Sequence, residues 1–155
     1  MPNQTMPILS ALLTCLCQQL ITDERPVCDC CLVASEELPP MTGCDCVCEG
    51  AQGTAWARLV SGAWQQPAVT KCPTGPWQVT FQIGVYRCVS SEPTCETKTA
   101  EATALANDAA SLARAVLCCD ALAGRNHTLG GLQIIGPLGG CIGVALDVVL
   151  ELGSL

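Results

Sequence analysis

Cysteine is the residue type in this sequence that offers the most chemistry, because the chain of 155 residues has 14 of them. Thiolates bind zinc, pair as disulfides and act as nucleophiles when their pKa is lowered. The cysteines gather in the first third of the chain and recur singly or in one pair later. They are Cys15, Cys17, Cys28, Cys30, Cys31, Cys44, Cys46, Cys48, Cys72, Cys88, Cys95, Cys118, Cys119 and Cys141.

The spacing of these cysteines favours a structural role as small apolar side chains. A zinc site usually combines two CxxC pairs, and only Cys28–Cys31 has that spacing. The run from Cys44 to Cys48 has CxC spacing, which places alternate side chains on one face of a strand. Two alternatives remain open. One is a zinc site formed by Cys28, Cys31, Cys44 and Cys46, and the other is a disulfide within these two clusters, in a particle that persists outside the reducing cell.

Residues that could perform catalysis are sparse. His127, the single histidine, lies in a connector rich in Gly, Asn and Thr, where we expect it to be solvated. A thiol-redox site at Cys28–Cys31 would need a helix N-terminus, but Pro26 and the β-prone residues around it disfavour one. The glycine-rich run from Gly136 to Gly143 precedes a predicted strand, which is the wrong context for binding phosphate. We therefore expect no enzyme activity and no cofactor.

Composition and charge narrow the possible partners. Only 14 % of the residues are charged, against about 25 % in ordinary soluble domains, so some of the surface should be buried against neighbouring subunits. The net charge is −7 and the seven basic residues are scattered, which disfavours stable binding of nucleic acid and suits a surface past which DNA slides. The apolar stretch from Ile8 to Leu16 is too short to span a bilayer, and Leu129–Leu146 is too rich in glycine. We expect a cytoplasmic place of synthesis, reduced cysteines and no membrane partner.

Hydrophobic periodicity predicts two helices and several strands within a single domain over residues 1–155. The expected order is helix, strands, helix, strand, which indicates an α+β fold with one antiparallel or mixed sheet and both helices packed on it. Cys44–Glu49 and Thr54–Val60 are expected to pair as a hairpin. The predicted helices are Pro7–Ile21 and Thr97–Leu122, and the predicted strands are Val27–Val33, Cys44–Glu49, Thr54–Val60, Trp77–Val89 and Cys141–Glu151.

Two predicted loops supply the candidate contacts with partners. Ser61–Pro76 contains three prolines and is unusually long for a connection inside a compact domain, so we expect it to meet another protein. The other loop, Glu36–Gly43, begins with two adjacent carboxylates that should be solvated. The candidate interface residues in these loops are Trp64, Gln65, Gln66, Lys71, Glu36 and Glu37.

Several stretches after Cys44 resemble small neck proteins of long-tailed phages that infect actinobacteria. These stretches are CDCVCEGAQGTAWARLV, WQVTFQIGVYRCV, AEATALANDAASLARAVLCC and GPLGGCIGVALDVVLEL. The order of elements is similar to that of the tail terminators, in which a sheet flanked by helices forms hexameric rings. The high cysteine count of the N-terminal half departs from this pattern.

The resemblance implies a structural virion protein without catalytic residues. Such a subunit would form a ring, made of copies of itself, that ends the tail tube at its set length, contacts the tail tube protein and the head-side connector, and lets DNA pass through its channel. Its place would be the virion neck, after assembly in the host cytoplasm. A head-closure or stopper protein is the alternative within the virion, and a zinc-stabilised cytoplasmic binding module is the alternative of another class.

Overall fold

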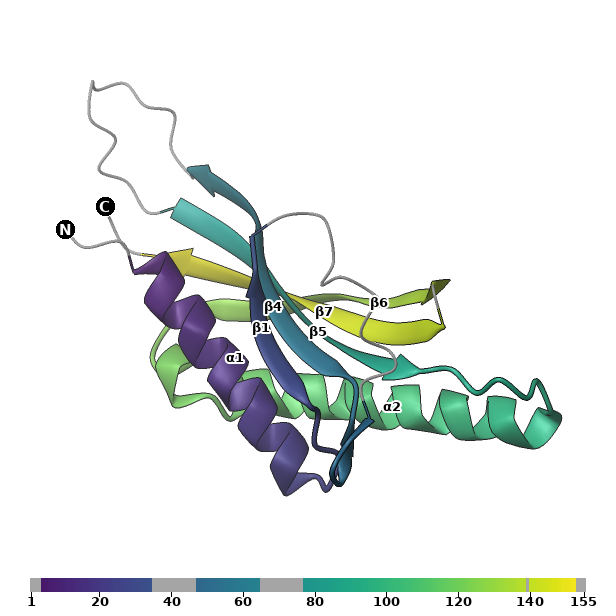
Figure 1. Ribbon diagram of the computed structural model, residues 1–155. Helices are drawn as coiled ribbons and strands as arrows, with labels where there is room; N and C mark the ends of the chain where they lie inside the picture. Colours follow the sequence, from purple (N-terminus) through teal and green to yellow (C-terminus); the bar gives the residue numbers. More distant parts are fainter. Residues whose placement is uncertain (1–3, 35–46, 65–76, 139, 153–155) are drawn as a thin grey trace.

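The computed structural model describes residues 4–34, 47–64, 77–138 and 140–152, which form a five-stranded sheet with two long helices beside it (Figure 1). The strand order is β1-β4-β5-β7-β6, with β1 parallel to β4 and every other pair antiparallel. A separate two-stranded ribbon joins β2 to β3. The elements are α1 (Thr5–Thr22), β1 (Asp29–Val33), β2 (Val47–Cys48), β3 (Ala51–Gln52), β4 (Thr54–Trp64), β5 (Trp77–Cys88), α2 (Cys95–Leu117), a short 3₁₀ turn (Asp120–Leu122), β6 (His127–Leu138) and β7 (Cys141–Leu152).

Both helices pack on the same face of the sheet, which confirms the predicted α+β fold. Leucines of α1, such as Leu12 and Leu16, are fully buried together with Leu112 of α2 and with Phe81 of β5. Alternate residues of β5 and β7 point into this core, as the period of two along a strand requires. In Figure 1, α1 lies beside β1 and β4, and α2 runs beneath the sheet.

Helix α1 begins two residues before the predicted start and ends one residue after the predicted end. Pro7 fits because it lies in the first turn, where backbone N–H groups have no partner within the helix. By length and composition α1 is apolar enough to cross a membrane. Its leucine side, however, is buried against the sheet, from Ile8 to Leu20. The apolar helix is 18 residues long, longer than the stretch Ile8–Leu16 that was expected to be too short to span a bilayer, and 39 % of it is buried inside the protein.

Helix α2 begins at Cys95 and ends at Leu117, so the predicted helix to Leu122 is too long at its C-terminus. A capping box starts it: the Thr94 hydroxyl accepts from the Thr97 backbone N–H, and the Thr97 hydroxyl accepts in turn from the Thr94 N–H. After Cys118 the chain makes a 3₁₀ turn, which buries Leu122 in the core. The apolar periodicity continues through that turn, which explains the overestimate.

The predicted strands at Val27–Val33, Trp77–Val89 and Cys141–Glu151 are confirmed as β1, β5 and β7. The predicted hairpin between Cys44–Glu49 and Thr54–Val60 is wrong. β2 instead turns at Glu49 and Gly50 to pair with β3, and β4 pairs with β1 and β5. β4 also continues to Trp64, so the first four residues of the predicted loop Ser61–Pro76 belong to a strand. The rest of that loop, together with Glu36–Gly43, lies outside the described residues.

The largest difference between the sequence prediction and the structure is at β6. The pattern before the last strand predicts a connector and a turn. β6 is a 12-residue edge strand that forms a hairpin with β7. Glycine and proline favour turns in a sequence pattern, but an edge strand tolerates both, since one of its sides makes no ladder hydrogen bonds. His127, predicted to lie in a loop, is the first residue of this strand.

The opposite face of the sheet carries two buried aromatic side chains. Trp56 and Tyr86 are buried there with their rings stacked at a centroid distance of 5.9 Å, and burial raises the pKa of Tyr86 to about 12. Gly84 and Gly143 make room for the rings: a Cβ on either glycine would lie 2.3 Å from Trp56 or 2.5 Å from Tyr86. The rings therefore lie directly on the backbone of β5 and β7.

The end of α1 is joined to α2 by a polar contact at Asp23. Its carboxylate accepts hydrogen bonds from the Ser111 hydroxyl at 2.6 Å and from the Arg114 guanidinium at 2.8 Å. These two hydrogen bonds, that from Ser111 first, hold the pKa of Asp23 below its ordinary value of 3.8. A lowered carboxyl pKa means that the contact stabilises the fold fully above pH 3.8 and loses that effect as the pH falls below it.

Replacing Ser111→Ala should raise the pKa of Asp23 toward the ordinary value, because the largest stabiliser of the carboxylate is removed. The side-chain carboxyl carbon of Asp23 reports this pKa in an NMR titration. The free energy of unfolding of the variant should also depend less steeply on pH in the acid range. Ser10→Ala, at an exposed position of α1, is the control and should leave the Asp23 titration unchanged. An identical Asp23 titration in S111A would contradict the assigned cause.

Candidate functional site

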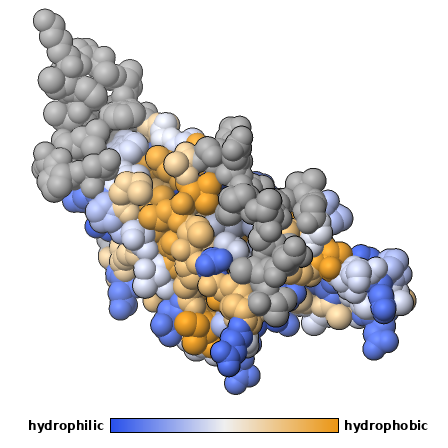
Figure 2. Space-filling view, in the orientation of Figure 1, coloured by the Kyte–Doolittle hydropathy of each residue, from blue (hydrophilic) through white to orange (hydrophobic). Residues whose placement is uncertain are grey.

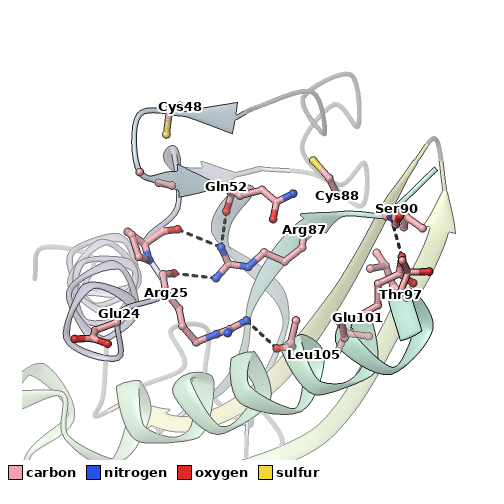
Figure 3. Close-up of a pocket in the computed structure, with 17 residues that line it drawn as sticks. Glu24, Arg25, Cys48, Gln52, Arg87, Cys88, Ser90, Thr97, Glu101 and Leu105 are labelled. Atoms are coloured by element: carbon pink, nitrogen blue, oxygen red, sulfur yellow. Dashed lines mark hydrogen bonds between the residues drawn. The ribbon is translucent and has the colours of Figure 1, made fainter. Parts of the chain in front are cut away.

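A cavity lies between the C-terminal end of β5, the first turns of α2 and the segment that joins α1 to β1 (Figure 3). Its volume is about 730 Å³. Charged and polar groups line it beside the apolar side chains of Leu105 and Ile142, and the labelled polar side chains are Glu24, Arg25, Gln52, Arg87, Ser90, Thr97 and Glu101. A cavity of this size, with charges in its wall, is the first place to look for binding or catalysis.

Arg87, at the end of β5, is the central group of the cavity wall. Its guanidinium donates to both carboxylate oxygens of Asp108, from Nε and Nη2 at 2.9 Å each. The remaining donors reach backbone carbonyl oxygens of Arg25 at 2.8 Å, Pro26 at 3.1 Å and Gln52 (Figure 3). Arg87 is therefore engaged within the protein and joins β5, β3, α2 and the segment after α1.

Asp108 is fully buried in the middle of α2, and a second cation meets it there. Arg25 donates from Nε to Asp108 at 2.8 Å and from Nη2 to the Ala104 carbonyl oxygen at 3.0 Å. The arrangement contains two guanidinium groups and one carboxylate, and all three side chains are held by hydrogen bonds. These charge-assisted hydrogen bonds join α2 to β5 and to the segment after α1.

At the rim of the cavity, Glu101 is held in the same way. The Ser90 backbone N–H donates to it at 2.8 Å and Lys98 at 3.1 Å, and these contacts, the Ser90 bond first, lower the pKa of the exposed Glu101 carboxyl. The Glu101 carboxylate on α2 thus binds the segment that follows β5. It is ionised and engaged, unlike a general acid, whose pKa has to be raised toward neutrality.

The sequence pattern contained one signal of this network. Asp108 lies three residues after Leu105 and four before Leu112, on the face of α2 that packs against the sheet. An acidic residue on an otherwise apolar helix face needs a buried cation. That its partners would be Arg25 and Arg87 depends on residues 83 and 21 positions away, and no local pattern identifies them.

The predicted interface residues are for the most part outside the described chain. Trp64 is the last residue of β4, and its backbone pairs with that of Trp77. Gln65, Gln66, Lys71, Glu36 and Glu37 lie outside the described residues. The interface formed by these loops therefore stays a prediction.

The four cysteines of the alternative zinc site do not come together as thiols in the described part of the chain. Cys28 is disulfide-bonded to Cys48, with the Cα atoms 5.7 Å apart. Cys31 is a free thiol on the face of β1 away from the helices, and Cys44 and Cys46 lie outside the described residues. No cluster of three or more Cys, His, Asp or Glu side chains that could hold a metal ion occurs among the described residues.

Disulfides correct the interpretation of the cysteines as apolar filler. Cys15–Cys119 joins α1 to the end of α2, Cys17–Cys30 joins α1 to β1, and Cys28–Cys48 joins the start of β1 to β2. Cys141 is also disulfide-bonded. Cys28–Cys48 links the two clusters in which the disulfide alternative placed a pair. The other two pairs were missed because their partners are far apart in sequence, or lie on a helix whose leucines already explained its pattern.

His127 has a local partner at the start of β6: its Nδ1 lies 2.9 Å from the Arg125 carbonyl oxygen. Its ring is half-buried beside the edge strand. This contact links the imidazole of His127, the first residue of β6, to the backbone of the turn before it.

Comparison with models of known protein families found no match, and a comparison with curated protein sequences also found none. The function is therefore inferred from the residues and the fold of the chain.

Replacing Asp108→Asn should destabilise the protein by about 3–5 kcal/mol, because two buried guanidinium groups lose their counter-charge. Urea unfolding followed by circular dichroism measures the difference. The control is Glu49→Gln, at an exposed turn, which should lie within about 0.5 kcal/mol of the parent. A D108N variant as stable as the control would show that the network is not what braces the fold.

The double variant Cys15→Ala, Cys119→Ala should lose about 2–5 kcal/mol of stability, because this disulfide closes a loop of 104 residues in the unfolded chain. Cys118→Ala, one residue away, removes an exposed free thiol and should change stability by less than about 0.5 kcal/mol. Both measurements use urea unfolding without reductant. Peptide mapping of the unreduced parent should yield the Cys15–Cys119 cross-link, and its absence would refute the pairing.

Proposed function

We propose that this protein is a structural subunit of a ring in the neck of a long-tailed phage, where the ring ends the tail tube and joins it to the head-side connector. The proposal builds on the resemblance of the sequence to tail terminators. It is supported by the α+β fold with both helices on one face of the sheet, which is the architecture that the resemblance implies.

The observation on which the proposal depends is the apolar surface. Large hydrophobic side chains are exposed on α1, β1, β4, α2 and β6, although the core is well filled. Single exposed apolar side chains are common on soluble proteins, whereas neighbouring ones, such as Leu129, Leu132 and Ile134 on one side of β6, form a patch of the kind that marks contacts with other proteins. The exposed residues are Met6, Ile21, Leu32, Leu59, Val60, Leu117, Leu129, Leu132 and Ile134. Contact with further subunits would bury them.

Two more properties agree with a ring through which DNA passes. The net charge of −7 disfavours adhesion of the phosphate backbone to the protein. The disulfides suit a particle that persists outside the reducing cell, since they constrain the unfolded chain without metal or cofactor. Arg25 and Arg87, which line the cavity described above, both donate to the buried Asp108, which favours a structural role over an enzyme.

The oligomeric state of the purified chain tests the proposal directly. Native mass spectrometry and negative-stain electron microscopy should detect closed rings, six-membered if the resemblance extends to stoichiometry. The expectation follows from the cost of leaving the apolar surface in water. At a protein concentration of about 0.1 mM, even contacts with a dissociation constant in the millimolar range form to a small extent. Detection of the monomer mass alone at this concentration would refute the proposal.

The position in the neck is tested in the phage that encodes the chain. Without a terminator, tails should lack a fixed length, because nothing caps the growing tube. Without a head-closure protein, tails of normal length should accumulate beside detached heads. Electron microscopy of lysates from a deletion of this gene therefore separates the two virion roles, and the second outcome would favour the alternative.

A further inference from the structure

The sheet has two open edges. β1 pairs only with β4, and β6 pairs only with β7, so no described strand covers the outer side of either. An open edge exposes unpaired backbone N–H and C=O groups, and most proteins protect such an edge with charged side chains or proline. β6 has no charged residue along its 12 residues, and its proline lies next to its end. β1 has one charged residue, Asp29, at its start, so the described residues of both edge strands carry little of this protection.

Apolar side chains line the two edges on the same side of the sheet. In β1, Leu32 is opposite Ala57 and so points to the side of the helices; it is 41 % exposed. In β6, Leu132 and Ile134 are opposite Leu146 and Val144 and point to that side too, at 52 % and 59 % exposure. Figure 2 shows a band of hydrophobic residues along the face on which α1 and β1 lie.

The strand directions make the two edges complementary. β1 runs parallel to β4, and the three antiparallel pairs that follow leave β6 pointing opposite to β1. If a neighbouring copy is rotated about an axis roughly along the strands, its β6 lies antiparallel to β1 of the first copy. Antiparallel pairing is the more stable kind, and this rotation keeps the helices of both copies on one side. Leu32 would then lie beside Leu132 and Ile134 of the next copy.

We propose that β1 of one copy pairs with β6 of the next, so that the sheets of neighbouring subunits become continuous around the ring. This inference rests on the proposed ring function and names the surfaces that form it. Such a contact is heterologous, because each copy uses two different edges, and it closes into a ring when the rotation per subunit divides a full turn. Strand addition of this kind gains backbone hydrogen bonds and buries the two apolar edges.

Lysine substitutions at the exposed edge residues test the pairing. Ile134→Lys and Leu32→Lys each place a charge in the contact while leaving the core untouched, so both should fold with the circular dichroism spectrum of the parent. Each should lower the ring population by about tenfold or more in native mass spectrometry, since a paired edge cannot bury an unpaired ammonium group. Leu132→Lys repeats the β6 test at a second position. The control, Ala106→Lys, changes an exposed position of α2 that belongs to neither edge and should still form rings.

Mixing the two blocked variants gives the decisive result. I134K retains an intact β1 edge and L32K retains an intact β6 edge, so an equimolar mixture at high concentration should form one-to-one dimers and nothing larger. If β6 instead pairs with β6 of a second copy, L32K alone stays dimeric, which would overturn the proposed pairing. Lysine variants that still form rings, or a mixture that stays monomeric, would also overturn it while the ring function stands. A single-copy parent protein would refute the ring and this pairing together.

Discussion

Asp108 is buried at the centre of α2 between the guanidinium groups of Arg25 and Arg87, and the arrangement of the surrounding elements depends on this contact. A carboxylate without water or a cation could not be accommodated there, because the energetic penalty of an uncompensated buried charge is several kcal/mol. The two arginines therefore fix how α2, the end of β5 and the segment after α1 lie relative to one another. Arg87 extends this to the ribbon of β2 and β3 through the carbonyl oxygen of Gln52.

The disulfides reinforce the same region from outside the core. Each of the three described pairs begins in α1 or in the segment that follows it, and together they join this N-terminal part to β1, β2 and the end of α2. α1 has no hydrogen-bonded neighbour of the kind a strand has, so its attachment otherwise depends on the leucines of one face. The three described disulfides and the buried ion network thus stabilise the N-terminal part of the fold, and Cys141 adds a disulfide in the β6–β7 hairpin at the other edge of the sheet.

The exposed surface is the part of the protein that bears on its function. Charges are few, and many of those described are committed to internal contacts at Asp108, Asp23 and Glu101. Along the edges of the sheet, Leu32 of β1 and Leu132 and Ile134 of β6 are exposed, together with the charged side chain of Asp29. In the proposed ring, contact between the edges of neighbouring copies would remove this apolar area from water.

The sequence by itself determined the elements with a strong period: the leucine face of α1, the alternation along β5 and β7, and the Ala-rich helix, because each of these patterns is local. It also predicted the α+β class. Only the tertiary structure decided that β6 is a strand, since glycines and Pro137 resemble a turn until the pairing with β7 is known. The partners of Asp108 and the pairing of Cys15 with Cys119 were likewise decided by the fold, because contacts between residues 83 or 104 positions apart leave no trace in local spacing.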